Sequence, residues 1–387
     1  MVNLKNNILL IQNYIEKNNF SGWDPYDAMN SPLLRILSLK SKYGKIGWTQ
    51  FMRRFPINLR LFLMVPRQQN PKGLGLFLGG YAKLYAADKN ASYLTRIHNL
   101  LNLLQETRSS GYAGNCWGYN FDWQSRAAFV PKYTPTIVNS SFIGHALVDV
   151  YETTGIQEAL DTAASIKDFI LQNLNRKTEG ETLCFSYTPL DNNYVHNANM
   201  LGASLLIRLS KITGDSSLRE PALASLAYSM KYQHRDGGWF YAEESIQHWI
   251  DSFHTGFNLE SLRWFLKLQE ANEYQANYNN AVEYYADKFF LDDGTPKYYC
   301  NKERPIDIHA ATEAICFFSG EGDRYRDLTE KIYHWMMNNM WNNKGGYFYF
   351  RKHSLFTVKI PYMRWSEAWG WRALTEYYYN TKTQHIE

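Results

Sequence analysis

Five apolar segments of the sequence each begin with polar or aromatic residues of types that carry out acid–base chemistry. In chain order, these residues are Asn139, His196, Asn197, Asp251, His254, Asp307, His309, Tyr362, Arg364, Trp365 and Glu367. Histidines and carboxylates are the side chains most often used to move protons in enzymes. A single polar residue at such a position is usually a helix cap, but His and Arg are not among the preferred caps. Because polar residues of these types recur at matching positions in five segments, we predict a functional site where the segments begin.

A further candidate acid, Asp122, lies in the aromatic stretch GNCWGYNFDWQ at residues 114–124. Burial among rings disfavours a charged carboxylate, and a protonated carboxyl group suits a general acid. Aromatic rings also stack on the apolar faces of sugars, and aromatic residues make up 16% of this chain, enough to line a cleft as well as a core. We therefore predict a saccharide cleft beside Asp122, with rings from Trp117, Tyr119, Trp123 and Trp239.

Two kinds of reaction fit these residues. In the first, a His or Tyr119 removes the proton next to a sugar carboxylate, and neighbouring polar groups neutralise that carboxylate, leading to β-elimination or epimerisation. The residues available for this reaction are Asn139, His196, His254, His309, Tyr362 and Arg364. In the second, Asp122 and Asp251 are the two carboxyl groups of a glycoside hydrolase, with Asp307 and Glu367 behind them. Histidines outnumber paired acids at the segment starts, which favours proton abstraction slightly.

Basic residues on the connections before these segments indicate an anionic substrate. Guanidinium and ammonium groups bind carboxylates through charge-assisted hydrogen bonds. The residues are Arg126, Lys132, Arg304, Arg351 and Arg364. We expect the partner to be an acidic, uronate-containing oligosaccharide or a lipid-linked polysaccharide precursor.

The elements that position these residues form a repeat. When Asn139, Asn197, His254, His309 and Trp365 are taken as equivalent, successive copies are 55 to 58 residues apart, and a weaker copy begins at Pro71. Each copy contains an apolar helical segment followed by a second amphipathic one, such as GIQEALDTAASIKDFILQNL. The pattern predicts an all-α fold, an (α/α)6 toroid over residues 66–387. Glycine- and aromatic-rich connections would form short β-hairpins or extended segments at one mouth. Residues 1–65 would form an N-terminal helical extension that packs on the barrel.

The repeat length and the GGW-type turn in YQHRDGGWFY resemble six-hairpin (α/α)6 toroid carbohydrate-active proteins. These proteins include glucuronyl hydrolases, polysaccharide lyases and sugar 2-epimerases, and more distantly terpene cyclases and prenyltransferase β-subunits. The runs GYAGNCWGYNFDWQSR and PKYTPTIVNSSFIGHAL are similar to a poorly characterised set of bacterial proteins from surface-polysaccharide gene clusters. The resemblance implies a carbohydrate-active enzyme of surface polysaccharide metabolism. It also relates His254 and His309 to the paired histidines of sugar 2-epimerases.

Other interpretations stay open at this point. A non-catalytic glycan-binding or assembly protein would keep the same cleft, and a prenyltransferase- or terpene-cyclase-like enzyme would have a dry apolar barrel. Zinc could bind His254, Asp307 and His309, although we expect neither a metal nor another cofactor.

Composition excludes further classes of function. The chain has 41 basic and 37 acidic residues with no cationic run suited to a nucleic-acid backbone, so we expect no nucleic-acid partner. No apolar stretch approaches the roughly 20 residues of a membrane-spanning helix. The four cysteines form no CxxC pair, and the N-terminus carries no cleavage signal, so the expected location is cytoplasmic.

Overall fold

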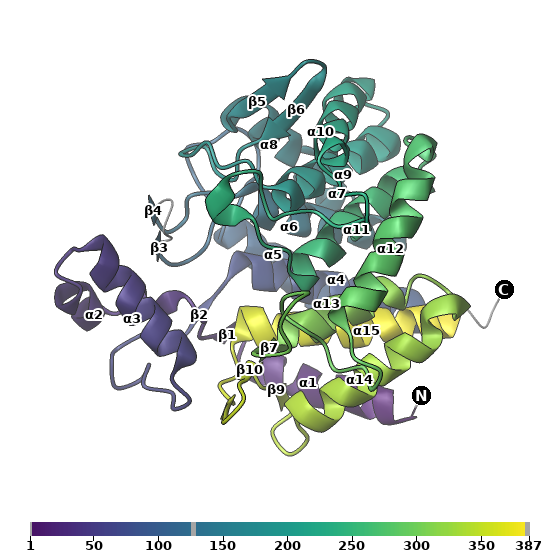
Figure 1. Ribbon diagram of the computed structural model, residues 1–387. Coiled ribbons are helices and arrows are strands. Elements are labelled where there is room, and N and C mark those ends of the chain that lie inside the picture. Colours follow the sequence, from purple (N-terminus) through teal and green to yellow (C-terminus); the bar gives the residue numbers. More distant parts are fainter. Residues whose placement is uncertain (1, 125–128, 384–387) are drawn as a thin grey trace.

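The computed structural model describes residues 2–124 and 129–383, and most of them form helices arranged in a ring (Figure 1). Six helices form the inner wall, and each packs against the next around the ring, with α15 against α4 closing it. They are α4 (Pro71–Asp88), α6 (Ile137–Thr154), α9 (His196–Thr213), α11 (Ser252–Lys267), α13 (Ile308–Phe318) and α15 (Ala368–Thr383). The prediction of an all-α (α/α)6 toroid is therefore confirmed.

Helix amphipathicity separates the inner helices from the outer ones. Inner helices such as α4 are buried on nearly every side, as expected for helices that are apolar all round. In outer helix α5 (Ser92–Glu106), the buried residues Ile97, Leu100, Leu101 and Leu104 form a single stripe. The other outer helices are α7 (Gln157–Ala164) with α8 (Ile166–Asn173), α10 (Arg219–Lys231), α12 (Gln275–Phe289) and α14 (Arg326–Met340).

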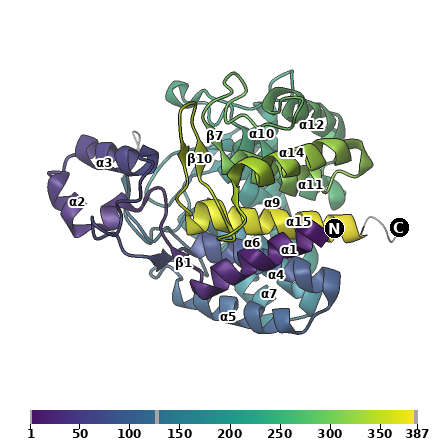
Figure 2. The same cartoon turned by 90° about the horizontal axis from the view of Figure 1, so that it is seen from below.

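The sixth outer position is occupied by α1 (Val2–Lys17), the first helix of the chain, which packs on the last helix, α15 (Figure 2). Ile11 and Ile15 of α1 are fully buried in the main core. At one end of α1, Asn7 donates a hydrogen bond to Tyr333 of α14, and at the other Glu16 pairs with Arg96 of α5. The segment 1–65 is thus divided, because α1 contributes to the toroid and only the residues after it lie outside the ring.

Residues 23–67, which we call the projecting unit, stand to one side of the ring in both views (Figures 1 and 2). The unit contains the 3-10 helix η1 (Asp27–Asn30), α2 (Pro32–Leu37) and α3 (Lys42–Arg54), with a small core of its own around Met29, Leu34 and Met52. At its base, β1 (Ser21–Gly22) pairs with β2 (Gln68–Gln69), which holds both ends of the unit together.

Buried ion pairs attach the projecting unit to the toroid. Arg364 donates two hydrogen bonds to the carboxylate of Asp24, at 2.6 and 2.9 Å, and both side chains are almost completely buried. Within the unit, Arg60 pairs with Asp27 at 2.8 Å, and its guanidinium lies over the ring of Tyr362. The two hydrogen bonds from Arg364 to Asp24 fix the orientation of the unit as well as its distance from the toroid.

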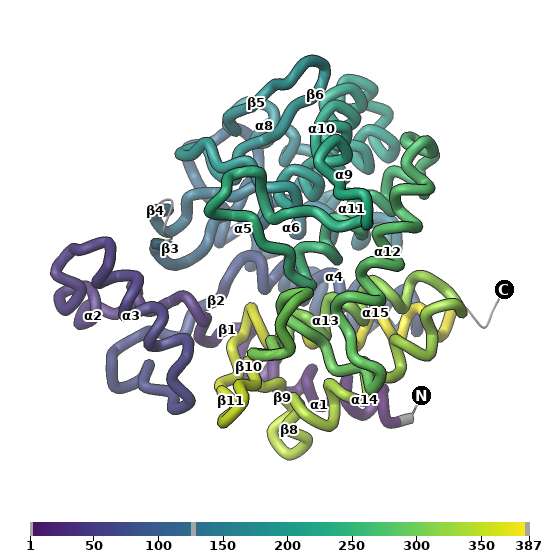
Figure 3. The backbone as a smooth tube through the Cα atoms, viewed as in Figure 1, coloured from purple at the N-terminus to yellow at the C-terminus, as the bar shows by residue number. Residues whose placement is uncertain are grey.

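Short strands precede the inner helices, as predicted for one mouth of the ring (Figure 3). β3 (Trp123–Gln124) pairs with β4 (Phe129–Val130) before α6, and β5 (Arg176–Glu179) pairs with β6 (Thr182–Phe185) before α9. β7 (Ile306–Asp307) leads into α13 and pairs with β10 (Arg351–Lys352), which also pairs with β11 (Thr357–Val358). The last connection also contains β8 (Trp341–Asn342) paired with β9 (Tyr347–Phe348), and a π-helical turn, Met363–Glu367, runs into α15.

Single turns of 3-10 helix lead into three outer helices and precede one inner helix. They are η2 (Ser216–Leu218), η3 (Ser245–Gln247), η4 (Asn272–Tyr274) and η5 (Asp323–Tyr325). In the described ranges, no helix combines the length and apolar character needed to cross a membrane.

Small residues allow the inner helices to approach one another closely. A Cβ atom added to Gly80 of α4 would lie 2.1 Å from the indole nitrogen of Trp371 on α15, at the joint that closes the ring. A larger residue there would have to displace a buried Trp, so the small-residue face seen in the sequence is a packing requirement.

We predict that Ile11→Ala lowers the free energy of unfolding by about 2–4 kcal/mol, because it opens a cavity between α1 and the main core. Leu9→Ala, on the same helix at a position that is 55% exposed, is the matched control and should change the free energy of unfolding by less than about 0.5 kcal/mol. Urea unfolding of the full chain measures both. Equal effects of the two variants would contradict the placement of α1 in the toroid.

We also predict that Asp24→Asn destabilises the chain by about 3–5 kcal/mol, because it leaves the buried guanidinium of Arg364 without a counter-charge. The control is Asp323→Asn, which removes an exposed pair with Arg326 and should have little effect. Combining Asp24→Leu with Arg364→Met should recover most of the loss. A single Asp24→Asn variant as stable as the parent chain would show that the pair does not hold the unit.

Candidate functional site

A small pocket opens where two neighbouring inner helices begin. The first turns of α9 and α11 contribute Asn197, Asp251, His254, Thr255 and Asn258, and the connection between α10 and α11 contributes Trp239, Phe240, Tyr241 and Trp249. Asn197, Trp239, Asp251 and His254 are among the residues predicted from the sequence. The structure thus brings them together on one wall of the mouth.

Asp251 performs two tasks at the start of α11. Its Oδ1 caps the helix by accepting a hydrogen bond from the His254 amide at 3.1 Å, and its Oδ2 lies 2.7 Å from Nδ1 of the His254 ring. Trp249 also donates its indole N–H to Oδ2, at 3.2 Å. The carboxylate therefore holds a proton on Nδ1 and leaves Nε2 of His254 as the acceptor, in a side chain that is 23% exposed.

Aromatic rings form a firm wall beside this histidine. Tyr241 and Trp249 are stacked at 4.8 Å between ring centroids, and the Tyr241 ring lies 4.7 Å from that of His254. Trp239 is held by a hydrogen bond from its indole N–H to the Ser229 carbonyl. Fixed, flat rings next to a polar group are the usual lining of a small-molecule site.

Unpaired amide groups lie in and near the pocket. Among the described residues, Oδ1 of Asn197 and Oδ1 of Asn258 are buried and have no hydrogen-bond partner, and neither amide atom of Asn139 has one. Buried polar atoms in folded proteins are nearly always satisfied by protein, water or a ligand. These amides can therefore bind hydroxyl groups of a ligand.

The two histidines on successive inner helices are neighbours, as predicted. His254 and His309 both contact the ring of Phe257, at 5.9 and 5.7 Å between centroids, and His309 stacks on Phe253 at 4.4 Å. Neither ring nitrogen of His309 has a partner among the described residues. Burial lowers the pKa of His309 well below its ordinary value, and nearby Lys72 lowers it further, so this ring is neutral.

Sequence reasoning missed two charged residues of the barrel interior. The ammonium of Lys72, at the start of α4, lies 4.2 Å from the ring centroid of Phe142, and burial lowers its pKa well below the ordinary value. Glu313 of α13 is fully buried, and burial together with Glu260 raises its pKa well above the ordinary value. Each is the one charged residue in an apolar run, PKGLGLFLGG and HAATEAICFF, and that signal could have identified both.

His196 begins α9 but faces outward from the pocket. Its Nε2 lies 2.9 Å from the Glu243 carboxylate and its Nδ1 lies 3.3 Å from Ser229. The contact with His196 lowers the pKa of Glu243. His196 therefore positions the connection that carries Tyr241, and it does not line the pocket.

The aromatic stretch around Asp122 lies apart from the pocket. Asp122 pairs with Arg35 of the projecting unit at 3.1 Å and accepts the Lys132 amide at 2.9 Å. Trp117 is completely buried and donates to the Leu104 carbonyl, and Trp123 packs half-buried against Tyr187. The predicted saccharide platform is thus largely a brace between the unit and the ring.

Tyr119, in the same stretch, stacks on Phe121 at 5.2 Å and lies under the guanidinium of Arg364. Burial raises the pKa of the Tyr119 hydroxyl, so the phenolate that would have to act as the base is disfavoured.

The predicted residues of the last two segments are engaged with protein partners. Asp307 caps α13 and accepts hydrogen bonds from Arg351 at 2.9 and 2.5 Å and from the Trp365 indole at 2.8 Å. Glu367 is fully buried and accepts the Phe348 amide, and burial raises its pKa well above the ordinary value.

Tyr362 is also fully buried, and its hydroxyl donates a long hydrogen bond, 3.5 Å, to the Met52 carbonyl. Arg351 and Arg364 are thus both in ion pairs, so neither is available to an anionic sugar as predicted. Lys132 and Arg304 are exposed, and Arg126 lies outside the described residues.

A zinc site at His254, Asp307 and His309 gains no support from this arrangement. The Asp307 carboxylate is occupied by Arg351 and Trp365, and no group of three or more His, Cys, Asp or Glu in the described ranges is arranged to hold a metal ion.

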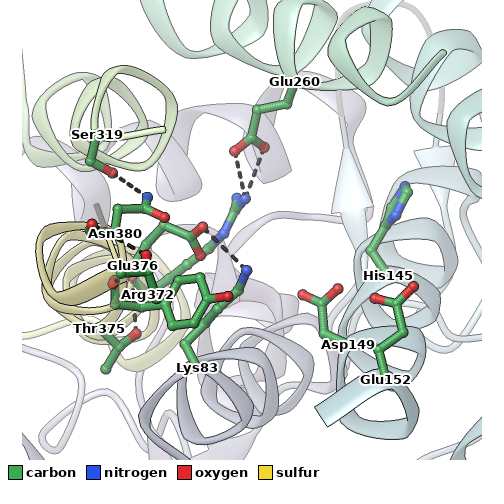
Figure 4. Close-up of polar contacts among 12 residues, drawn as sticks. Lys83, His145, Asp149, Glu152, Glu260, Ser319, Arg372, Thr375, Glu376 and Asn380 are labelled. Carbon is green, nitrogen blue, oxygen red and sulfur yellow. Dashed lines mark hydrogen bonds and ion pairs between the residues drawn. The ribbon is translucent and has the colours of Figure 1, made fainter. Parts of the chain in front are cut away.

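A second, larger cavity lies further along the inner helices, and Figure 4 shows several of the polar residues around it. Its charged residues pair with one another between inner helices: Arg372 of α15 with Glu260 of α11 at 2.7 and 2.8 Å, and Lys83 of α4 with Glu376 of the adjacent α15 at 3.3 Å. On the other wall, Arg208 of α9 holds Asp149 and Glu152 of the adjacent α6. Burial beside Arg208 lowers the pKa of His145 to about 3, so this histidine is neutral. These pairs connect inner helices and explain the cluster as part of the scaffold.

Comparison with known structures agrees with this fold. A cellobiose 2-epimerase from Bacillus thermoamylovorans is similar at a TM-score of 0.62 and 15% identity, with 80% of this chain and 87% of that chain covered. A GH76 α-mannanase from Bacteroides thetaiotaomicron gives a TM-score of 0.58 at 14% identity, with 84% and 88% covered. A family 88 glycosyl hydrolase from Bacteroides vulgatus gives 0.57 at 12% identity, with 85% and 97% covered.

These identities establish a shared fold only, and no curated protein matches the chain. The resemblance to six-hairpin toroid carbohydrate-active proteins is confirmed. A family model described as β-L-arabinofuranosidase, GH127 catalytic domain, matches residues 67–289, which include the His254 pocket. Because this match spans more than half of the sequence, the chain belongs to the GH127 catalytic-domain family and is a carbohydrate-active enzyme.

Proposed function

We propose that the chain transfers protons on an acidic, uronate-containing glycan bound in the His254 pocket, in a lyase- or epimerase-like reaction of bacterial surface polysaccharide metabolism. The observation that carries the proposal is the 2.7 Å contact between Asp251 and Nδ1 of His254, within an aromatic wall and beside unpaired amides. A carboxylate-oriented imidazole is suited to act as a general base near neutral pH.

In this mechanism, Nε2 of His254 accepts the proton from the sugar carbon next to the carboxylate. The electron pair of that C–H bond moves into the carboxylate, and Asp251 stabilises the resulting imidazolium. β-Elimination then expels the neighbouring glycosidic oxygen, which takes a proton from the imidazolium of His254 or from water, and leaves a carbon–carbon double bond. Epimerisation instead returns a proton to the opposite face of the same carbon; His309, beyond Phe257, could deliver it only after taking up a proton itself, which its burial opposes.

Lys72 is the candidate for neutralising the sugar carboxylate. Among the described residues it forms no ion pair, whereas Arg351 and Arg364 are already committed. Burial disfavours its charged form in the free protein. A bound carboxylate reverses that balance, because a nearby anion favours the protonated amine. An acidic sugar would therefore bind together with a proton.

Glycoside hydrolysis is the second candidate, and the family description as a β-L-arabinofuranosidase favours it. Hydrolysis generally needs two carboxyl groups across the scissile bond. Asp251 lines the pocket, but Asp122 is bound to Arg35 outside it. A hydrolytic reaction would thus require a different acid. Buried Glu313 is a candidate, because its raised pKa favours the protonated form that a general acid needs.

We predict that His254→Ala lowers kcat by about 10²–10⁴-fold, because it removes the general base. Asp251→Asn should lower it less and also destabilise the start of α11. The measurement uses a panel of uronate oligosaccharides in deuterated water, followed by mass spectrometry and by absorbance of unsaturated uronate. The matched control, His98→Ala, changes an exposed histidine of α5 and should keep full activity.

The reaction products distinguish epimerisation, elimination and hydrolysis. Deuterium on the sugar carbon without cleavage indicates epimerisation, and a new double bond indicates elimination. New reducing ends with neither signal would replace the proposal by hydrolysis. Full activity of His254→Ala would remove this residue from the mechanism.

We predict that Lys72→Met raises KM for an acidic oligosaccharide at least about tenfold, while KM for the carboxyl-reduced analogue changes little. The side chain of Met has a similar length without the charge, so it keeps the packing against Phe142. Lys132→Met, an exposed change, is the control. If both substrates were affected equally, Lys72 would act on packing and not on the carboxylate.

A further inference from the structure

The net charge of the chain hides a strong local asymmetry. Residues 28–67 contain eight basic residues and no acidic one. The projecting unit as a whole, residues 23–67, also holds Asp24 and Asp27, so its net charge is +6, and the remainder of the chain carries −2. A cationic module is therefore attached to a ring of net negative charge.

The projecting unit also carries most of the exposed apolar surface. Nine of the seventeen large hydrophobic side chains that are exposed in the described part of the chain lie between residues 36 and 64. Leu39 is 84% exposed, Phe62 79% and Leu61 72%. Apolar exposure concentrated in so short a segment marks an interaction surface.

Backbone geometry presents these side chains outward. Leu39, Lys40 and Met64 have φ angles of 52°, 57° and 54°, in the left-handed region that costs energy for residues other than glycine. Leu39 and Lys40 lie in the turn between α2 and α3, and Met64 lies in the segment between α3 and β2. These turns therefore lower the stability of the chain, and they place apolar side chains in solvent.

Several cations lie among these apolar side chains. Lys40 and Arg54 are exposed and have no ion pair among the described residues, and the ammonium of Lys45 lies 4.3 Å from the ring centroid of Phe129. Exposed apolar side chains interspersed with Lys and Arg are the composition of segments that lie in a membrane interface.

We propose that the projecting unit binds the surface of an anionic phospholipid membrane, with Leu39, Leu61 and Phe62 entering the headgroup region and Lys40 and Arg54 contacting phosphates. A nucleic acid would match the charge but not the apolar side chains. A second copy of the chain would bring two units of the same net positive charge together, and their like charges would repel. The inference does not depend on the reaction at the His254 pocket.

This binding would also set the position of the mouth. The unit contacts the connection before α6 through Arg35 and Asp122, and it contacts the last segment through Asp24 and Arg364. Attachment at a membrane would therefore hold the mouth at the bilayer surface, where lipid-linked sugars are located.

Co-sedimentation of the full chain with vesicles tests the proposal. We expect binding to vesicles of phosphatidylglycerol and phosphatidylethanolamine, weaker binding at about 0.5 M salt, and little binding to phosphatidylcholine vesicles. The double variants Leu61→Ser with Phe62→Ser, and Lys40→Glu with Arg54→Glu, should each lower the partition coefficient at least about tenfold. Leu355→Ser, at a 95% exposed position elsewhere, is the control and should bind as the parent chain does.

The changed residues are exposed, so each variant should keep the melting temperature of the parent chain, and this is measured first. Absence of binding to anionic vesicles would overturn the proposal, as would equal losses in the Leu355→Ser control. Concentration-dependent dimerisation in the absence of vesicles, abolished by Leu61→Ser with Phe62→Ser, would show that the surface binds a second copy instead.

Discussion

The mouth of the toroid depends on one requirement, that the first amide groups of each inner helix need an acceptor. At four of the six inner helices a polar side chain meets this need: Asn70 for α4, Thr136 for α6, Asp251 for α11 and Asp307 for α13, whereas α9 begins after Val195 without a side-chain cap. A carboxylate has a second oxygen free after capping. Asp251 uses that oxygen to orient His254, and Asp307 uses its own to hold Arg351. The need to cap helices thus places charged groups around the opening.

The ring was predictable because each repeat carries its own signal. Inner helices are apolar on every side, outer helices carry one apolar stripe, and the spacing between copies is nearly constant. The closure of the ring was not predictable in the same way. Outer helix α1 packs on α15 from the other end of the sequence, and no repeat spacing connects two elements so far apart. The proximity of His254 and His309 was predictable from the repeat, because equivalent positions on adjacent helices lie at the same level along the axis of the ring.

Residues that were assigned to substrate binding but serve the scaffold share one property, a distant partner. Asp122 is held by Arg35, which lies 87 residues away, and Arg364 is held by Asp24, which lies 340 residues away. Residue type and local spacing indicate that an arginine is at the mouth, but not whether a carboxylate from another segment has already neutralised it. Lys72 was missed for a different reason: it is the one charged residue of the apolar run PKGLGLFLGG, and that signal was not followed up.

The two cavities described in the barrel differ in how the charged and polar groups around them are paired. Around the larger cavity, Arg372 and Lys83 each have a carboxylate partner (Figure 4). Arg208 also has one, so these charges stabilise contacts between inner helices. Near the mouth, Asn197, Asn258 and His309 keep buried atoms without partners. Such atoms cost stability unless something outside the chain completes them. Around the larger cavity, Nε of Arg208 and Nη1 of Arg372 also lack a hydrogen-bond partner, so the two cavities differ in the pairing of their charges and not in whether every polar atom is satisfied. The uncharged amides near the mouth are the groups that the proposed sugar ligand would complete through its hydroxyl groups.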